Sequence, residues 1–143
     1  MVLGGTAPST LLKSPREIEI MARGGAILHA TLMHAKAHVR PGVSTMELDQ
    51  LVEAFIRSHA GAEPAFKGLY GFPGSACISI NEEIVHGIPS RKRILAEGDI
   101  VTVDVGVKLD GMFTDSAITI PVGAIDAETQ KLLDVTQRSL DAG

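Results

Sequence analysis

Two aspartates in a predicted β-hairpin are the residues best suited to metal chemistry in this 143-residue sequence. Residues 100–109 alternate between valines and other side chains, and the Asp110-Gly111 pair that follows is typical of a two-residue hairpin turn. With that turn, Asp104 and Asp115 become diagonal neighbours on the face opposite the valines. Two carboxylates at this spacing repel each other unless a cation lies between them or one is protonated. The pattern alone favours a solvated sheet face, where such polar side chains belong. Aspartate is disfavoured in strand centres, however, so two facing aspartates in one hairpin keep a cation site as the other interpretation.

His86 and Cys77 are further candidates for chemistry. His86 ends an apolar run and precedes both aspartates along the chain. Histidine titrates near neutral pH, so His86 is a candidate for catalysis or substrate binding, although His86 taken alone is better interpreted as a hydrogen-bonded loop histidine. Cys77 has no basic neighbour in sequence, which favours a small buried or pocket-lining residue over a nucleophile.

Two other groups of residues carry weaker signals. His34 and His38 have the i,i+4 spacing of helical metal ligands, but no glutamate adjoins His34, so both are interpreted as solvated. The basic run SRKR (90–93) is interpreted as a solvated turn rather than a nucleic-acid site.

The elements that must position these residues follow from capping and periodicity. SPRE (14–17) and STME (44–47) are capping boxes that begin two helices, which we expect to end near 39–42 and by 60–64. Residues 66–75, rich in glycine and aromatics, indicate an ordered loop.

The second half of the sequence is strand-like and then helical. ACISI (76–80) and EIVH (83–86) predict two short strands, the hairpin adds 100–109 and 112–120, and 126–143 predicts a third helix. The expected fold class is α+β: two N-terminal helices, an antiparallel β-meander and a C-terminal helix.

Composition is typical of a single globular domain over 1–143, with residues 1–13 expected to be flexible. The chain is 45% hydrophobic with 3% aromatics, so the core must be aliphatic. A net charge of −4 gives no basic surface for nucleic acid or membranes. One cysteine suits a reducing cytoplasm, and no signal peptide or membrane-spanning run is visible.

Four stretches together resemble the type I methionine aminopeptidases: GVSTMELD, YGFPGSACISINEEIVHGIP, GDIVTVDVGVKLDG and TDSA. The match runs in order from about Ser14 to Gly123. The resemblance implies the pita-bread fold, in which two similar α+β halves enclose a dinuclear metal site. It also implies hydrolase activity, the removal of the initiator methionine from nascent proteins when the next residue is small.

The resemblance assigns a role to each candidate. Asp104 corresponds to an aspartate that chelates one metal ion, and Asp115 to an aspartate that bridges two. His86 corresponds to a histidine that contacts substrate without ligating metal. The implied cofactors are two divalent ions, with Co, Mn, Fe and Zn all compatible with hard carboxylate ligands.

The methionine side-chain pocket of the family corresponds to Phe66, Leu69, Phe72 and Cys77. The first three depart from the Cys or Tyr that family members often carry there. The implied partners are N-terminal methionyl peptides and the ribosome, with no membrane or nucleic-acid partner.

The family takes another metal-binding histidine, two metal-binding glutamates and a second catalytic histidine from its second half, and no motif here replaces them. We therefore expect a truncated, N-terminal half of the catalytic domain that is inactive alone and self-associates through unburied apolar surface. Two alternatives stay open: a related pita-bread hydrolase of Xaa-Pro bonds, against which ISINEEIVHGIP argues, and a non-catalytic half-domain that binds peptides or a partner chain.

Overall fold

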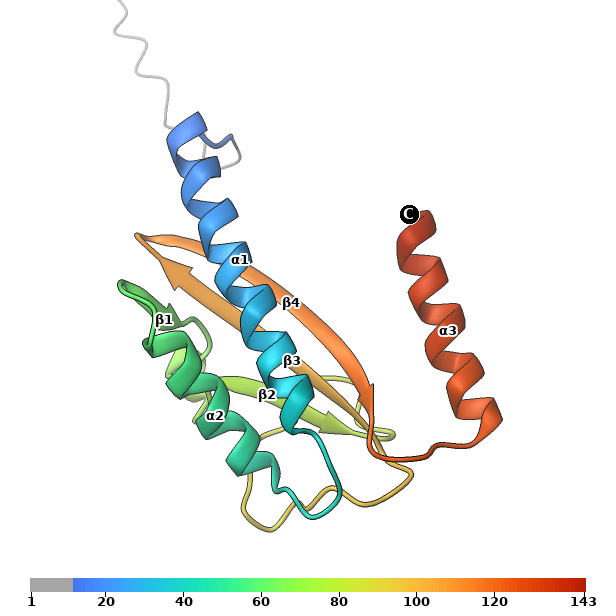
Figure 1. The fold of residues 1–143 in the computed structure, drawn as a ribbon. Helices are drawn as coiled ribbons and strands as arrows, with labels where there is room; N and C mark the ends of the chain where they lie inside the picture. The colour runs from blue at the N-terminus through green and yellow to red at the C-terminus, as the bar shows by residue number, and fades with distance from the viewer. Residues whose placement is uncertain (1–11) are drawn as a thin grey trace, which may run out of the picture.

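The structure, a computed structural model, describes residues 12–143, and the predicted flexible segment 1–13 lies almost entirely outside them. Helices α1 (Pro15–His38) and α2 (Thr45–Arg57) cover one face of an antiparallel sheet, and α3 (Ala127–Ala142) follows the last strand (Figure 1). The predicted α+β order of two helices, a sheet and a final helix is confirmed.

Both predicted capping boxes are present. The Ser14 hydroxyl accepts from the Glu17 N–H at 3.3 Å, and the Glu17 carboxylate accepts from the Ser14 N–H at 2.7 Å. The corresponding distances for Ser44 and Glu47 are 3.2 and 2.8 Å. Each box satisfies backbone donors that have no partner inside the helix, which is why the two helices begin where the sequence predicts.

The sheet is organised around one long strand. Strand β3 (Ile100–Leu109) pairs along its whole length with β4 (Met112–Pro121), and its other edge pairs with β1 (Ala62–Pro64) and β2 (Ala76–Ile80). All pairings are antiparallel. Strand β3 is thereby hydrogen-bonded along both edges, which fixes the positions of the side chains that it carries.

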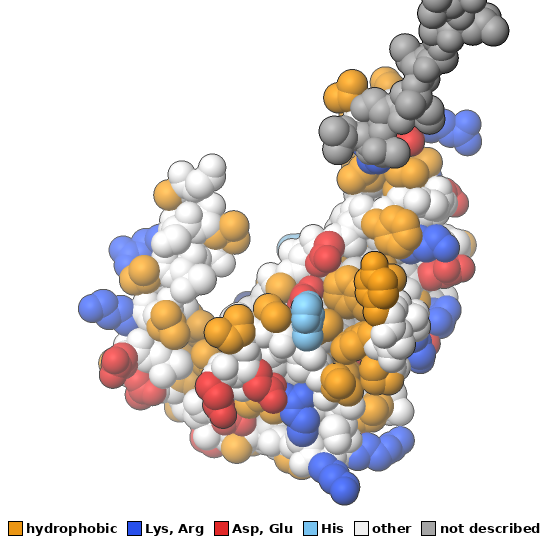
Figure 2. Space-filling model, turned by 180° about the vertical axis from the view of Figure 1, so that it is seen from behind, with side chains coloured by type: hydrophobic (Ala, Val, Ile, Leu, Met, Phe, Trp, Pro, Cys, Tyr) orange, Lys and Arg blue, Asp and Glu red, His pale blue; other side chains and the backbone are white. Residues whose placement is uncertain are grey.

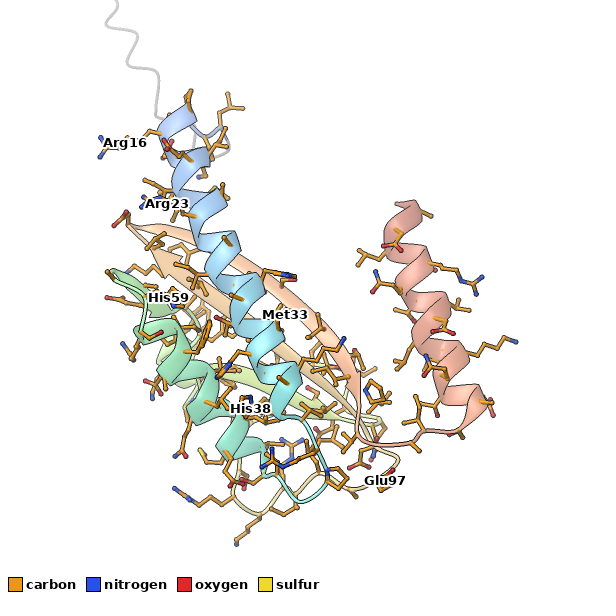
Figure 3. The ribbon with its side chains drawn as sticks, viewed as in Figure 1. Arg16, Arg23, Met33, His38, His59 and Glu97 are labelled. Carbon is orange, nitrogen blue, oxygen red and sulfur yellow. The ribbon has the colours of Figure 1, made fainter. Side chains whose placement is uncertain are left out.

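The β3–β4 turn has the predicted form. Asp110 and Gly111 have φ angles of 47° and 81°, the positive values that a two-residue hairpin turn of type I′ requires. The Asp110 carboxylate accepts from the Arg23 guanidinium at 3.1 Å, and Figure 3 shows Arg23 on α1 beside this turn. The turn pairs Leu109 with Met112 and so sets the register of the whole hairpin.

The core between the helices and the sheet is aliphatic, as the scarcity of aromatic residues predicts. The odd-numbered valines of β3 point towards α1 and α2 and are completely buried: Val101, Val103, Val105 and Val107. Leu48, Val52 and Ile56 on α2 pack against them with no more than 1% of each side chain exposed. The even-numbered residues of β3 consequently face the opposite side of the sheet.

The second short strand predicted at residues 83–86 is wrong. Asn81 and His86 have φ angles of 54° and 61°, which a β-strand does not accommodate. Ile84 and Val85 are 85% and 59% exposed, so their apolar character does not reflect a buried strand. The short strand β1, in contrast, carries no periodic signal and is absent from the sequence prediction.

Helix α3 leaves its apolar side chains uncovered among the residues described. None of its residues is buried, and Leu132, Val135 and Leu140 are 58%, 42% and 74% exposed. Exposed apolar surface of this kind favours association with another chain. Self-association stays a prediction. Within residues 12–143, no helix is long and apolar enough to cross a membrane.

Candidate active site

The hairpin places Asp104 and Asp115 on the sheet face that points away from α1 and α2. In the β3–β4 register, Asp104 lies opposite Ala117 and Asp115 lies opposite Gly106, as predicted. Both side chains line the same cavity. The predicted geometry of the pair is therefore confirmed, and its role as a metal-ligand pair stays a prediction.

The two carboxylates perturb each other. Partial burial is the main cause that raises the pKa of Asp104 to about 6, and the adjacent charge and hydrogen bonding of Asp115 add to it. The nearby His86 acts in the opposite direction. At neutral pH the pair concentrates negative charge in a partly desolvated site, and a cation between the carboxylates would relieve that repulsion.

All seven residues predicted for the site line one cavity of about 520 Å³. Figure 2 shows this face of the molecule, where acidic and histidine side chains are surrounded by hydrophobic ones. The lining consists of Phe66, Leu69, Tyr70, Gly71, Phe72, Pro73, Cys77, His86, Ile88, Asp104 and Asp115. The sequence prediction missed Tyr70, Gly71, Pro73 and Ile88, although Ile88 follows His86 closely enough to have been included.

The loop that forms the apolar wall is ordered, as predicted for residues 66–75. The Leu69 N–H donates to the Phe66 carbonyl at 3.0 Å and the Gly68 N–H to the Phe72 carbonyl at 2.8 Å, around the short helix η1 (Leu69–Gly71). These bonds hold Phe66, Leu69 and Phe72 in one compact loop. All three side chains line the cavity together with the two carboxylates.

Gly106 allows Phe66 to lie directly on the sheet. A Cβ atom at Gly106 would lie 2.6 Å from Cε1 of Phe66 and 2.9 Å from the Cβ of Ala65. The Ala65 N–H also donates to the Gly106 carbonyl at 2.9 Å. Because Gly106 pairs with Asp115, this close approach brings the aromatic wall of the cavity next to the carboxylate pair.

Cys77 is a pocket-lining residue rather than a nucleophile. It is the cross-strand partner of Asp104 and only 6% exposed. Burial, with the charges of Asp104, Asp115 and Asp49 in addition, raises the pKa of the Cys77 thiol to about 11. In the metal-free chain the thiol is therefore protonated at neutral pH, which disfavours its nucleophilic form.

Asp49 supports the strand that carries Cys77, and the sequence prediction missed it. Its carboxylate accepts from the Ser75 N–H at 2.7 Å and the Ala76 N–H at 2.9 Å, although burial raises its pKa. The signal that could have found it is an aspartate on the buried face of α2, between the apolar Leu48 and Val52.

His34 and His38 lie outside the cavity, and they are half-buried rather than solvated. The His34 ring stacks on Phe55 at 4.5 Å between centroids and lies 4.6 Å from the His38 ring. Figure 3 shows His38 beside α2. Both histidine side chains are therefore packing residues between α1 and α2.

The cavity suits a divalent cation only in part. Hard carboxylate oxygens are suitable ligands for Mn, Fe, Co or Zn. Among residues 12–143, however, no group of three or more His, Cys, Asp or Glu side chains is arranged to hold a metal ion. Asp104 and Asp115 thus supply an anionic pair that fits a metal, and they leave most of its coordination sphere to other ligands.

The raised pKa of Asp104 predicts a pH-dependent stability for the metal-free chain. The folded state holds the proton up to about pH 6, whereas an unfolded Asp releases it near about 4. Protonated Asp104 therefore stabilises the folded state fully below the pKa of the unfolded chain. This stabilisation is lost as the pH rises through the pKa of Asp104 in the folded chain. Between these pH values the free energy of unfolding should fall by on the order of 1 kcal/mol relative to Asp104→Asn, after allowance for partial exposure. Urea melts of both chains at a series of pH values check this, and a parallel pH dependence in both would contradict it.

The pattern of metallopeptidase family M24 matches residues 19–143. Methionine aminopeptidase 1 of Bacillus subtilis is 51% identical over 133 residues, which are 93% of this chain and 53% of that protein. The crystal structure of methionine aminopeptidase from Thermotoga maritima superposes with a TM-score of 0.87 at 36% identity, over 91% of this chain and 52% of that one.

A second activity appears among the structural neighbours. Xaa-Pro dipeptidase from Bacillus anthracis superposes with a TM-score of 0.73 at 28% identity, over 85% of this chain and 32% of that one. The predicted likeness to part of a pita-bread enzyme is confirmed by these neighbours. The chain spans about half the length of the curated relatives it matches.

Proposed function

The chain belongs to metallopeptidase family M24, and from this premise we propose that it forms the carboxylate and side-chain-binding part of an enzyme that releases N-terminal methionine from peptides. The observation that carries the proposal is the meeting of Asp104, Asp115 and His86 with an apolar wall in one cavity. The cavity volume of about 520 Å³ is within the range of small-molecule sites.

Asp104 and Asp115 would hold the metal ions in this proposal. A divalent metal at such a site polarises a peptide carbonyl and lowers the pKa of a water molecule, which is the chemistry that amide hydrolysis requires.

The remaining residues bind and orient the substrate. Phe66, Leu69 and Phe72 receive the methionine side chain, since a thioether packs well against aromatic and aliphatic surface. The protonated thiol of Cys77 adds small apolar surface at the base of this wall. His86 faces the same cavity as the carboxylates and hydrogen-bonds the scissile amide or the oxygen on which charge develops.

The proposed substrates are nascent proteins with a small residue after the initiator methionine, encountered at the ribosome in the cytoplasm. Two metal ions and their identity belong to the same proposal, with Mn, Fe, Co and Zn as the candidates.

Hydrolysis of Xaa-Pro bonds is the second candidate, because an Xaa-Pro dipeptidase shares the fold. The higher identity to the Bacillus subtilis relative favours methionine release, as does the run ISINEEIVHGIP. A third hypothesis is a non-catalytic half-domain that binds peptides, and methionine release in the assay below would exclude it.

Methionine release from Met-Ala-Ser tests the proposal, with Mn, Co, Fe or Zn added to two proteins. One is the 143-residue chain, and the other is a chimera in which the remaining half of the Bacillus subtilis relative follows it. We expect release by the chimera and none by the chain alone, because two carboxylates leave each metal mostly to water. A folded, metal-loaded chimera that releases no methionine would contradict the proposed function. Release by the chain alone that Asp104→Asn abolishes would show that this half suffices.

A further inference from the structure

The loop that carries His86 docks on the outer edge of β2. One edge of β2 pairs with β3, and residues of the loop bond to groups on the other side. The Ile78 N–H donates to the Gly87 carbonyl at 2.8 Å, and the Gly87 N–H donates to the Ser79 hydroxyl at 3.1 Å. A side chain on Gly87 would collide with the Ile78 carbonyl group, so the loop touches the strand at this point.

Arg93 is the residue that closes this loop. One guanidinium nitrogen of Arg93 donates to the Ile78 carbonyl at 3.1 Å and to the Ile88 carbonyl at 2.8 Å. The other terminal nitrogen bonds the Glu83 carboxylate, which in turn accepts from the Ile80 N–H at 2.8 Å. A single side chain thus joins the strand edge to the loop on both sides of His86.

We propose that Arg93 is the positioning residue that holds His86 over the carboxylate pair, a proposal that rests on the role proposed for His86. His86 itself has a φ of 61°, an unfavourable backbone conformation that persists only where the surroundings impose it. The Glu83 and Ile88 attachments lie on either side of it, and Gly87 is bonded to the strand. The interpretation of 90–93 as a wholly solvated turn is therefore wrong for Arg93.

The chemistry of the guanidinium explains why arginine occupies this position. Its planar fork presents several N–H donors in fixed directions and can serve three acceptors at once. A lysine could reach one of these acceptors but has no rigid fork. Asn81 and Asp99 brace the start of the same loop through a bond of 2.8 Å, so the loop stays attached to the molecule when Arg93 is removed.

Amide hydrogen exchange on the metal-free 143-residue chain tests the proposal. Arg93→Gln should lower protection of the Ile78 N–H by at least about tenfold, since its acceptor is on the loop, and leave Val103 in β3 within twofold. The His86 ring resonance should move towards its position in the denatured chain. Arg91→Gln is the matched control, because Arg91 is exposed and two residues away, and should change neither signal.

A further variant keeps the result decisive. Arg93→Lys, which retains the charge, replaces Arg93→Gln if that variant does not fold. It should show a smaller loss of protection at the Ile78 N–H. Equal effects of Arg93→Gln and Arg91→Gln, or a uniform loss of protection that includes Val103, would overturn the positioning role. Because the samples contain no metal and no substrate, the outcome is independent of methionine release. A chimera that fails to release methionine would remove the proposed function and leave the Arg93 result standing.

Discussion

Replacing Asp104 with asparagine should lower the affinity of the chain for Mn²⁺ or Co²⁺ by at least about 100-fold. Mutating a residue that only hydrogen-bonds a metal ligand already lowers metal affinity by up to about 100-fold, and Asp104 is proposed to be a ligand itself. Asparagine keeps the shape of the side chain and removes its charge. The described residues offer only two carboxylates in the cavity, so the change removes half of the anionic ligand set. Isothermal titration of both chains at neutral pH, where Asp104 is ionised, measures the difference.

Asp110→Asn is the matched control for this experiment. Asp110 belongs to the same hairpin and faces Arg23 instead of the cavity. Asparagine tolerates its positive φ, so the turn and the register should persist. Unchanged metal affinity in Asp104→Asn, or an equal loss in Asp110→Asn, would remove the carboxylate pair as the metal site.

Replacing His86 with alanine should leave metal content unchanged and lower methionine release by the chimera by about 10²–10⁴, the usual contribution of one positioned acid–base group. His86 lines the cavity beside the carboxylates, and its proposed partner is the substrate, not the metal. Elemental analysis and turnover of the same preparations separate these two effects. His59→Ala, on the far side of the sheet where the ring packs on Phe55, is a control that should retain turnover.

A His86→Ala chimera that has lost its metal would assign His86 to the ligand set and contradict the role proposed here. Full turnover in that variant would remove His86 from the chemistry altogether. Neither result would contradict the Asp104 prediction, because that prediction is measured as metal affinity of the Asp104→Asn chain and not as turnover.

The hairpin was predictable because each part of it has a local cause. The Asp110-Gly111 turn sets the register, and alternation of valines with other residues along β3 selects the buried face. Together they place Asp104 and Asp115 on one face without any long-range information. The capping boxes at Ser14 and Ser44 fix the helix starts in the same local way.

The segment between β2 and β3 was not predictable for a physical reason. Residues 83–86 have the apolar composition of a strand, but Arg93 takes the Ile78 carbonyl and the Glu83 carboxylate takes the Ile80 N–H. Side chains thus occupy the positions that another strand would pair with. The Arg93 bond joins residues 15 positions apart and leaves no periodic pattern, and the same holds for the Asp49 contacts that begin β2.

The pocket residues Phe66, Leu69, Phe72 and Cys77 were expected from a resemblance to a known family and not from spacing. Aromatic and aliphatic residues in a glycine-rich loop carry no signal of where the loop folds. The contact that brings Phe66 to the carboxylates is the bare backbone of Gly106 beneath its ring, and Cys77 reaches them through its pairing with Asp104.

Line broadening by Mn²⁺ in the amide NMR spectrum of the 143-residue chain tests the central claim most directly. The paramagnetic ion broadens signals according to their distance from it, so the spectrum locates the bound metal. We predict that the signals of Asp104, Asp115, Cys77 and His86 broaden first, while those of α3 and of the Asp110 turn remain sharp. Broadening centred on His34 and His38, or elsewhere in the chain, with Asp104 and Asp115 sharp, would contradict the account.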